Sequence, residues 1–251
     1  MKYKKVLLLL AAGLILSFCA STQKKAAGDT EKDAQYQYEK AVVALRYDLP
    51  GQAIEYLQQA IALDPGHDQS YKLLGLACIK TKNYAGAAAA YQKYLELKPD
   101  VSEVHSNLGL VYEELGEKDK AEEEYKKAIA IDGNANAGFN LAKLYYGQNN
   151  LERALEYARE SIKKKSDLAA AHNLEGVILN QMGRYGEALG SFENALRLSP
   201  KDLNLRVNLG IAYINNKEFG RAREILEKVL PAIQDQALKD KVTEYLKLIK
   251  E

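Results

Sequence analysis

The stretch "LGLVYEELGEKDKA", residues 108–121, joins a leucine–glycine pair to an alanine that follows the glycine by 12 positions. The same pattern returns three times with its leucine and twice more without it. The small residues stand at positions 41, 75, 109, 142, 176 and 210, and the alanines at 53, 87, 121, 154, 188 and 222. Successive copies are therefore 33 or 34 residues apart, which indicates a repeat architecture.

This unit resembles the tetratricopeptide repeat, a helix–turn–helix of 34 residues. The prolines agree with it, because Pro65 and Pro99 are 34 residues apart and Pro200 stands at the same place three repeats later. The resemblance covers residues 34–235. It predicts repeats at 34–67, 68–101, 102–134, 135–168, 169–202 and 203–235.

The tail "QALKDKVTEYLKLIK", residues 236–250, has apolar residues at helical spacing. Over 236–251 we expect a helix that covers the open apolar face of the last repeat, since each repeat buries its face only against a neighbour. The predicted fold is all-α. It is a right-handed superhelical solenoid of six helix–turn–helix repeats with a C-terminal capping helix.

The small residues predict where the two helices of a repeat touch, because helix axes come within about 8–10 Å of each other only where the contact residues are small. Larger residues are expected on either side, such as Tyr112 with Tyr125 and Leu179 with Phe192. Turns are predicted at "LPG", residues 49–51, and at Gly116 and Gly183.

The N-terminus has the pattern of a secretory signal peptide. Lysines at positions 2, 4 and 5 precede an apolar run from Val6 to Leu16, which is shorter than the roughly 20 residues of a membrane-spanning helix. The sequence Leu16-Ser17-Phe18-Cys19 resembles a bacterial lipobox, although Phe18 stands where a small residue is usual. We therefore expect a signal peptide over 1–18, a lipid on Cys19 and a flexible tether over 19–33.

Two other outcomes remain open for this segment. The signal peptide can be cleaved near Ser21 without lipidation, or it can stay as an uncleaved anchor. Acylation leaves Cys19 no thiol, so the other cysteine, Cys78, is expected to be buried and inert.

Composition and motifs argue against most kinds of chemistry. Removal of residues 1–18 lowers Lys+Arg from 35 to 32 against 34 Asp+Glu, so no basic surface for nucleic acid is expected. Phosphate-binding loops, GxSxG and HExxH motifs are absent from the sequence, and the three histidines lack metal-ligand spacing. The acidic stretch at 117–127 is interpreted as a solvated helix face with i,i+4 lysine partners. We expect no catalytic residue, metal, cofactor or small-molecule substrate.

The candidate binding residues come from the resemblance, which implies that the first helices line a concave groove. Asn107, Asn140 and Asn208 share repeat position 6, and Asn173 is one place earlier in its repeat. They resemble the asparagine ladder with which some members of the family hold the backbone of an extended peptide. Asparagine is also common at this position throughout the family, so the ladder has a purely structural alternative. The other predicted lining residues are Phe139, Lys143, Tyr146, Val177, Asn180, Val207, Ile211 and Asn215.

These observations predict a protein-binding scaffold that holds an extended, mostly uncharged partner segment. With a lipid on Cys19 it is expected in a bacterial cell envelope. Ala20 lacks the aspartate that retains lipoproteins in the inner membrane, which favours the outer membrane, facing the periplasm. The architecture resembles the pilotin lipoproteins of type IV pilus biogenesis, which implies help to an outer-membrane secretin. A non-catalytic recruiting subunit of a separate enzyme is the alternative.

Overall fold

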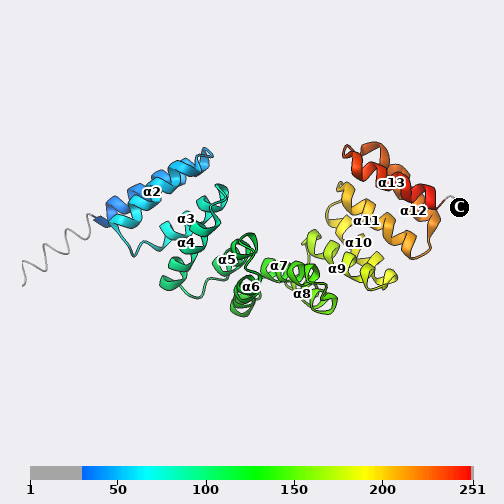
Figure 1. Cartoon of the computed structure of the whole chain (residues 1–251), viewed down its shortest axis with the longest axis horizontal. Helices are drawn as coiled ribbons and strands as arrows, with labels where there is room; N and C mark the ends of the chain where they lie inside the picture. Colours follow the sequence, from blue (N-terminus) through cyan, green and yellow to red (C-terminus); the bar gives the residue numbers. More distant parts are fainter. Residues whose placement is uncertain (1–29, 250–251) are drawn as a thin grey trace, which may run out of the picture. The chain divides into compact units, whose positions relative to one another are not determined.

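The computed structural model describes residues 30–249, which form helices with short connections (Figure 1). The predicted signal peptide, Cys19 and residues 20–29 of the tether lie outside the described residues. Residues 30–33, also expected in the tether, are helical instead. The helices cover 30–46, α2 (Pro50–Leu63), α3 (Asp68–Lys80), α4 (Tyr84–Leu97), α5 (Ser102–Glu114), α6 (Lys118–Asp132), α7 (Ala135–Gly147), α8 (Leu151–Lys164), α9 (Ala169–Gln181), α10 (Tyr185–Leu198), α11 (Leu203–Asn215), α12 (Phe219–Val229), the 3₁₀ turn η1 (Leu230–Ala232) and α13 (Gln236–Leu248).

The all-α fold of paired helices is confirmed, and no strand occurs within residues 30–249. The helices form two compact units. The first unit contains the described residues up to Val104 together with 111–116. The second contains 105–110 and the residues from Glu117 onward.

The core of the first unit is built from small residues facing larger ones. Ala41, Ala53 and Leu57 are fully buried between the helix over 30–46 and α2, and Ala77 of α3 joins the same cluster. In the next pair, a Cβ added to Gly75 would lie 2.4 Å from the ring of Tyr91. Glycine is therefore required there because the tyrosine ring lies directly on the backbone of α3.

The second unit repeats this arrangement with different partners. A Cβ on Gly176 would lie 2.7 Å from the ring of Phe192, and one on Gly210 would lie 2.5 Å from Leu226. Ala142 carries a methyl group at the same repeat position, and in that repeat the small Ala158 stands at the position of Phe192 and Leu226. The residue pairs are thus complementary in volume, which is how close-packed cores accommodate substitutions.

The turn inside each hairpin has one residue with a positive φ angle, always at the same repeat position. These residues are Asp48, Lys82, Gly116, Asn149, Gly183 and Lys217. The turn predicted at residues 49–51 is displaced, because Pro50 and Gly51 already belong to α2. Proline is favourable in the first helical turn, where its missing N–H has no intrahelical partner.

The C-terminal helix α13 covers the last pair. Val242 and Leu246 of α13 are buried in one cluster with Leu226 and Val229 of α12. None of the helices within residues 30–249 combines the length and apolarity that crossing a bilayer requires.

Candidate functional site

Two pairs of asparagine side chains connect α9 with α11. The Nδ2 of Asn208 donates to the Oδ1 of Asn173 at 2.9 Å, and the Nδ2 of Asn215 donates to the Oδ1 of Asn180 at 2.9 Å. Each pair joins two first helices across a repeat boundary. The predicted amides of repeats 5 and 6 therefore lie together in space.

The two amide pairs are seven residues apart on both helices, which corresponds to about 10 Å of helix. Between them lie Val177 of α9 and Ile211 of α11, both partly buried. Residues spaced by three or four share one side of a helix, so each amide stands beside an apolar residue. The result is a small apolar patch with an amide pair at either end.

Each amide retains hydrogen-bonding capacity beyond its bond to the other member of the pair. An asparagine side chain offers two donors and an acceptor with two lone pairs, and one bond within a pair uses part of this. All four amides are partly buried. They are thus accessible to a ligand and are held in place by each other.

Helix α7 continues this surface, because α7 contacts α9 and α9 contacts α11. Phe139, Lys143 and Tyr146 stand on α7 at i, i+4 and i+7, and the Lys143 Nζ lies 5.8 Å from the centre of the Phe139 ring. Lys143 is exposed, whereas Phe139 and Tyr146 are partly buried and Asn140 is buried. We name the surface formed by these α7 residues and by Asn173, Val177, Asn180, Asn208, Ile211 and Asn215 the first-helix face.

Two predicted residues stand apart from the first-helix face. Val207 is buried in the cluster that includes Val242 and Leu246 of α13, so it does not line an open groove. Its repeat position predicted a groove residue, but its side chain belongs to a buried cluster that also contains residues of α12 and α13. Asn107 is partly buried on α5, and none of the described residues of the first-helix face is hydrogen-bonded to its side chain.

The structure reveals one polar contact that the sequence did not predict. Glu124 is buried on α6, and its Oε2 lies 2.6 Å from the Nδ1 of His105 on α5. Its Oε1 accepts from Lys127 at 2.9 Å. Lys126 with Glu122 and Lys127 with Glu123 form the predicted i,i+4 pairs at 2.6 and 2.7 Å. The signal for Glu124 was its place between the buried Ala121, Tyr125 and Ala128, which is the inner side of α6.

The other titratable groups have structural surroundings. The Nε2 of the buried His172 donates to the carbonyl of Ser166 at 3.0 Å, which ties the start of α9 to the preceding loop. Cys78 is buried as expected, and burial raises the pKa of its thiol. Within residues 30–249 no group of three or more His, Cys, Asp or Glu side chains is placed to hold a metal ion.

Comparison with known proteins agrees with the repeat fold. Three family models, each described as a tetratricopeptide repeat, match residues 38–102 and 139–202, residues 102–135, and residues 179–242. The first of these models alone covers half of the chain.

Individual relatives share the repeats at low identity. The TPR repeat-containing protein MJ1428 of Methanocaldococcus jannaschii is 25% identical over 82% of this chain and 38% of its own length. The type IV pilus assembly protein PilF of Pseudomonas aeruginosa is 28% identical over 66% of this chain and 69% of its own. The crystal structure of PilW, a type IV pilus biogenesis factor, superposes with a TM-score of 0.67 at 16% identity, over 87% of this chain and 98% of PilW.

Proposed function

From the premise that the chain belongs to the tetratricopeptide repeat family, a family of protein-interaction scaffolds, we propose that it binds an extended, largely uncharged segment of a partner protein on its first-helix face. The observation that carries this proposal is the double amide pair between α9 and α11. A peptide unit has one donor and one acceptor, which an asparagine side chain can satisfy together.

The spacing of the amide pairs predicts how many residues of the bound segment lie between its two backbone contacts. An extended chain rises about 3.3 Å per residue, so the roughly 10 Å between the two pairs corresponds to about three residues. Val177 and Ile211 lie between the pairs and offer contact to an apolar side chain. We therefore expect a segment with an apolar residue between two backbone contacts.

The charge of the face points to a neutral ligand. Lys143 is the only ionisable ammonium or carboxylate group among the residues that define the first-helix face, and its ammonium lies near the ring of Phe139. A strongly charged ligand would lose its hydration without gaining a partner of opposite charge. The proposed function includes no catalytic step.

Site-specific photo-cross-linking tests this proposal in cells. A benzophenone amino acid at Lys143 should cross-link to one partner protein, and mass spectrometry should map the adduct to a short, uncharged segment. Lys163 on α8 is the matched control, since it is also an exposed lysine but lies on a second helix. Equal cross-linking from both positions, or none from Lys143, would contradict the first-helix face as the binding site.

We further propose that the chain is a lipoprotein of a bacterial cell envelope, anchored through Cys19 in the outer membrane and facing the periplasm. The support is the apolar run from Val6 to Leu16 that ends in Leu16-Ser17-Phe18-Cys19. Metabolic labelling with a palmitate analogue should tag the wild type and leave Cys19→Ala unlabelled. A labelled Cys19→Ala variant, or mature protein that retains residues 1–18, would be inconsistent with this anchor.

A role in type IV pilus or secretin assembly is the second candidate function. It is favoured by the similarity to PilF, whose matched region covers 69% of that protein. Affinity purification from envelope membranes distinguishes it from the recruiting-subunit alternative. A pilus or secretin component should be recovered in the first case, and a soluble enzyme in the second.

A further inference from the structure

The first-helix face has the same two kinds of side chain at two levels. At each level an aromatic ring of α7 stands at the same repeat position as an asparagine of α9 that belongs to an amide pair. The members are Phe139, Asn173 and Asn208 at the first level, and Tyr146, Asn180 and Asn215 at the second. Because stacked repeats place equal positions side by side, each level combines one ring with one amide pair.

This combination is particular to α7, α9 and α11. The levels lie seven residues apart on each helix, which is about 10 Å, but any helix offers that spacing. What differs between repeats is the chemistry of the two ring positions. On α3 they hold Lys72 and Ile79, and on α5 they hold Ser106 and Glu113. Among the described first helices, only α7 carries a ring at both positions.

The distance between the levels selects a conformation of the bound segment. In a β-strand each residue rises about 3.3 Å and successive side chains alternate, so residues three apart face opposite sides. In a polyproline II helix each residue rises about 3.1 Å with three residues per turn, so every third residue returns to the same side after about 9.3 Å. A segment in the polyproline II conformation therefore presents the same side to both levels, and a β-strand does not.

The amide pairs match the carbonyl groups of such a segment. The two amides of the first pair have four N–H groups, and one of them is used between Asn208 and Asn173, so three remain for a ligand. The second pair is bonded in the same way. A polyproline II backbone has no internal hydrogen bonds, so all its carbonyls can accept from these groups. Proline supplies a carbonyl and brings no N–H group that would need an acceptor.

The aromatic rings favour proline over other uncharged residues. Phe139 and Tyr146 are partly buried, so part of each ring remains open to a ligand. Aromatic-lined grooves bind proline-rich segments because the polyproline II helix is already formed and little conformational freedom is lost on binding. The residues that define the first-helix face include no carboxylate, and their one ammonium group, on Lys143, lies 5.8 Å from the centre of the Phe139 ring. The face therefore suits an uncharged, proline-rich ligand.

We propose that the first-helix face binds a proline-rich segment of the partner protein in the polyproline II conformation. Two prolines, three residues apart, pack on Phe139 and Tyr146, and carbonyl groups of the same segment accept from the amide pairs. The residues between these prolines lie over Val177 and Ile211, so an apolar residue is expected there. This inference rests on the proposed function, because it specifies the composition and conformation of the segment bound at the same site.

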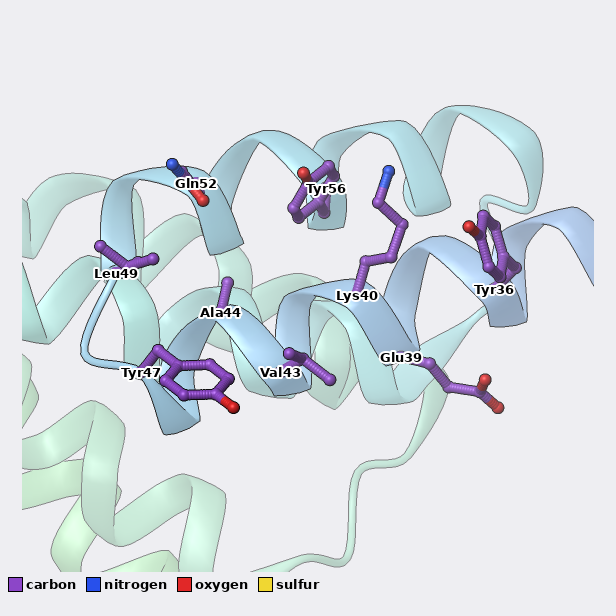
Figure 2. A pocket seen from close by; sticks show the side chains of 9 residues that line it. All are labelled: Tyr36, Glu39, Lys40, Val43, Ala44, Tyr47, Leu49, Gln52 and Tyr56. Atoms are coloured by element: carbon purple, nitrogen blue, oxygen red, sulfur yellow. The ribbon is translucent and has the colours of Figure 1, made fainter.

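Another group of aromatic side chains provides a matched control. Figure 2 shows Tyr36, Tyr47 and Tyr56 among the residues that line a hollow of about 440 Å³ between the helix over 30–46 and α2. The Nζ of Lys40 lies 4.0 Å from the centre of the Tyr56 ring, and Glu39 lines the same hollow. The rings there stand beside charged groups, and no asparagine is among the described residues that line the hollow. Binding of an uncharged, proline-rich peptide is therefore not expected at this place.

Fluorescence anisotropy with two synthetic peptides tests the inference on the purified chain. One labelled peptide has three Pro-Pro-Leu repeats, and the other has three Thr-Thr-Leu repeats, which are equally uncharged but favour a β-strand. The first should bind at least about tenfold more tightly, because its bound conformation is already formed. Phe139→Leu and Tyr146→Leu should each weaken its binding by about tenfold, since each removes one ring from the face. Tyr47→Leu, at an exposed tyrosine of the control hollow, should leave binding unchanged.

The outcomes distinguish this inference from the proposed function. Equal or tighter binding of the Thr-Thr-Leu peptide, lost in Asn180→Ala/Asn215→Ala, would overturn the polyproline II conformation and leave a site for an extended uncharged segment. Binding of neither peptide, or an equal loss in Tyr47→Leu and Tyr146→Leu, would also overturn the inference, whereas photo-cross-linking from Lys143 tests the proposed function separately. The comparison of the two peptides uses the wild type alone, so it remains decisive even where a variant fails to fold.

Discussion

Each hairpin turn contains one residue in the left-handed region of backbone conformation, and its type determines the strain in that turn. Gly116 and Gly183 occupy the left-handed region in two turns, whereas Lys82 and Lys217 occupy it in two others. A residue with a Cβ pays about 1–2 kcal/mol in that conformation, and glycine does not. The repeats therefore tolerate strained turn residues where the surrounding helices define the turn.

A pair of glycine substitutions in one repeat should have opposite effects. Gly183→Ala should destabilise the protein by about 1 kcal/mol, since φ is +75° there. Gly190→Ala should stabilise it by about 0.5–1 kcal/mol, because Gly190 lies inside α10 with open space around its Cα. Chemical denaturation of both variants checks the two signs. Equal shifts in one direction would show that the turn does not hold Gly183 in the left-handed region.

At the scale of helices, complementary residue pairs determine how closely two helices pack. Ala188 is fully buried on α10, and the ring of Phe192 on the same helix covers Gly176 of α9. Small residues at both places bring the helices together, and the larger side chain closes the remaining space.

Ala188→Leu should force α9 and α10 apart at a cost of about 1–3 kcal/mol, as overpacking typically does. In a repeat array this loss is expected to be local, so amide hydrogen exchange should rise first in α9, α10 and their neighbours. Ala170→Leu, the same change at an exposed position of α9, is the control and should leave exchange unchanged. A uniform rise along the whole chain, or no rise, would argue against the assigned pairing.

Much of this arrangement was predictable from the repeats, because buried small residues recur with the period of the structure. The helical pairs follow from that period through the resemblance to the tetratricopeptide repeat, and the terminal helix follows from the helical spacing of the apolar residues in its own sequence. The first turn was predicted at "LPG", residues 49–51, because proline and glycine commonly form turns. In the structure the left-handed residue of this turn is Asp48. Proline inside the first turn of α2 is compatible with a helix, so composition alone does not separate the two readings.

The candidate site was less predictable, because its contacts cross between repeats. The register suggested that Asn173 and Asn208 face one groove, but only the structure pairs them through a hydrogen bond. Val207 is buried in a cluster that also contains residues of α12 and α13, and its repeat position did not predict this burial. The contact of Glu124 was not predicted for a similar reason, since its partner His105 comes from another helix.

At the scale of the whole molecule, function depends on whether these amides hold a partner or only each other. The asparagines can have a purely structural role, because the bonds within the pairs link α9 to α11 without any ligand. The two alternatives differ in what removal of a pair does. A purely structural pair affects unfolding, whereas a binding pair affects affinity for the partner.

Replacement of one complete pair, Asn180→Ala/Asn215→Ala, should separate these alternatives. Removing both members leaves no unpaired amide at this position, so the free energy of unfolding is expected to fall by at most about 1 kcal/mol. If each amide also holds a peptide group, binding of the co-purified partner should weaken by about 2 kcal/mol, which is roughly 30-fold. The affinity should change little between low and high salt, because the contacts are to neutral groups. Calorimetry on the wild type, the double variant and Asn194→Ala, an exposed asparagine of α10, measures these effects, with circular dichroism as the check on helix content. Unchanged affinity in the double variant would assign the pairs to the structure alone and place the partner elsewhere on the chain.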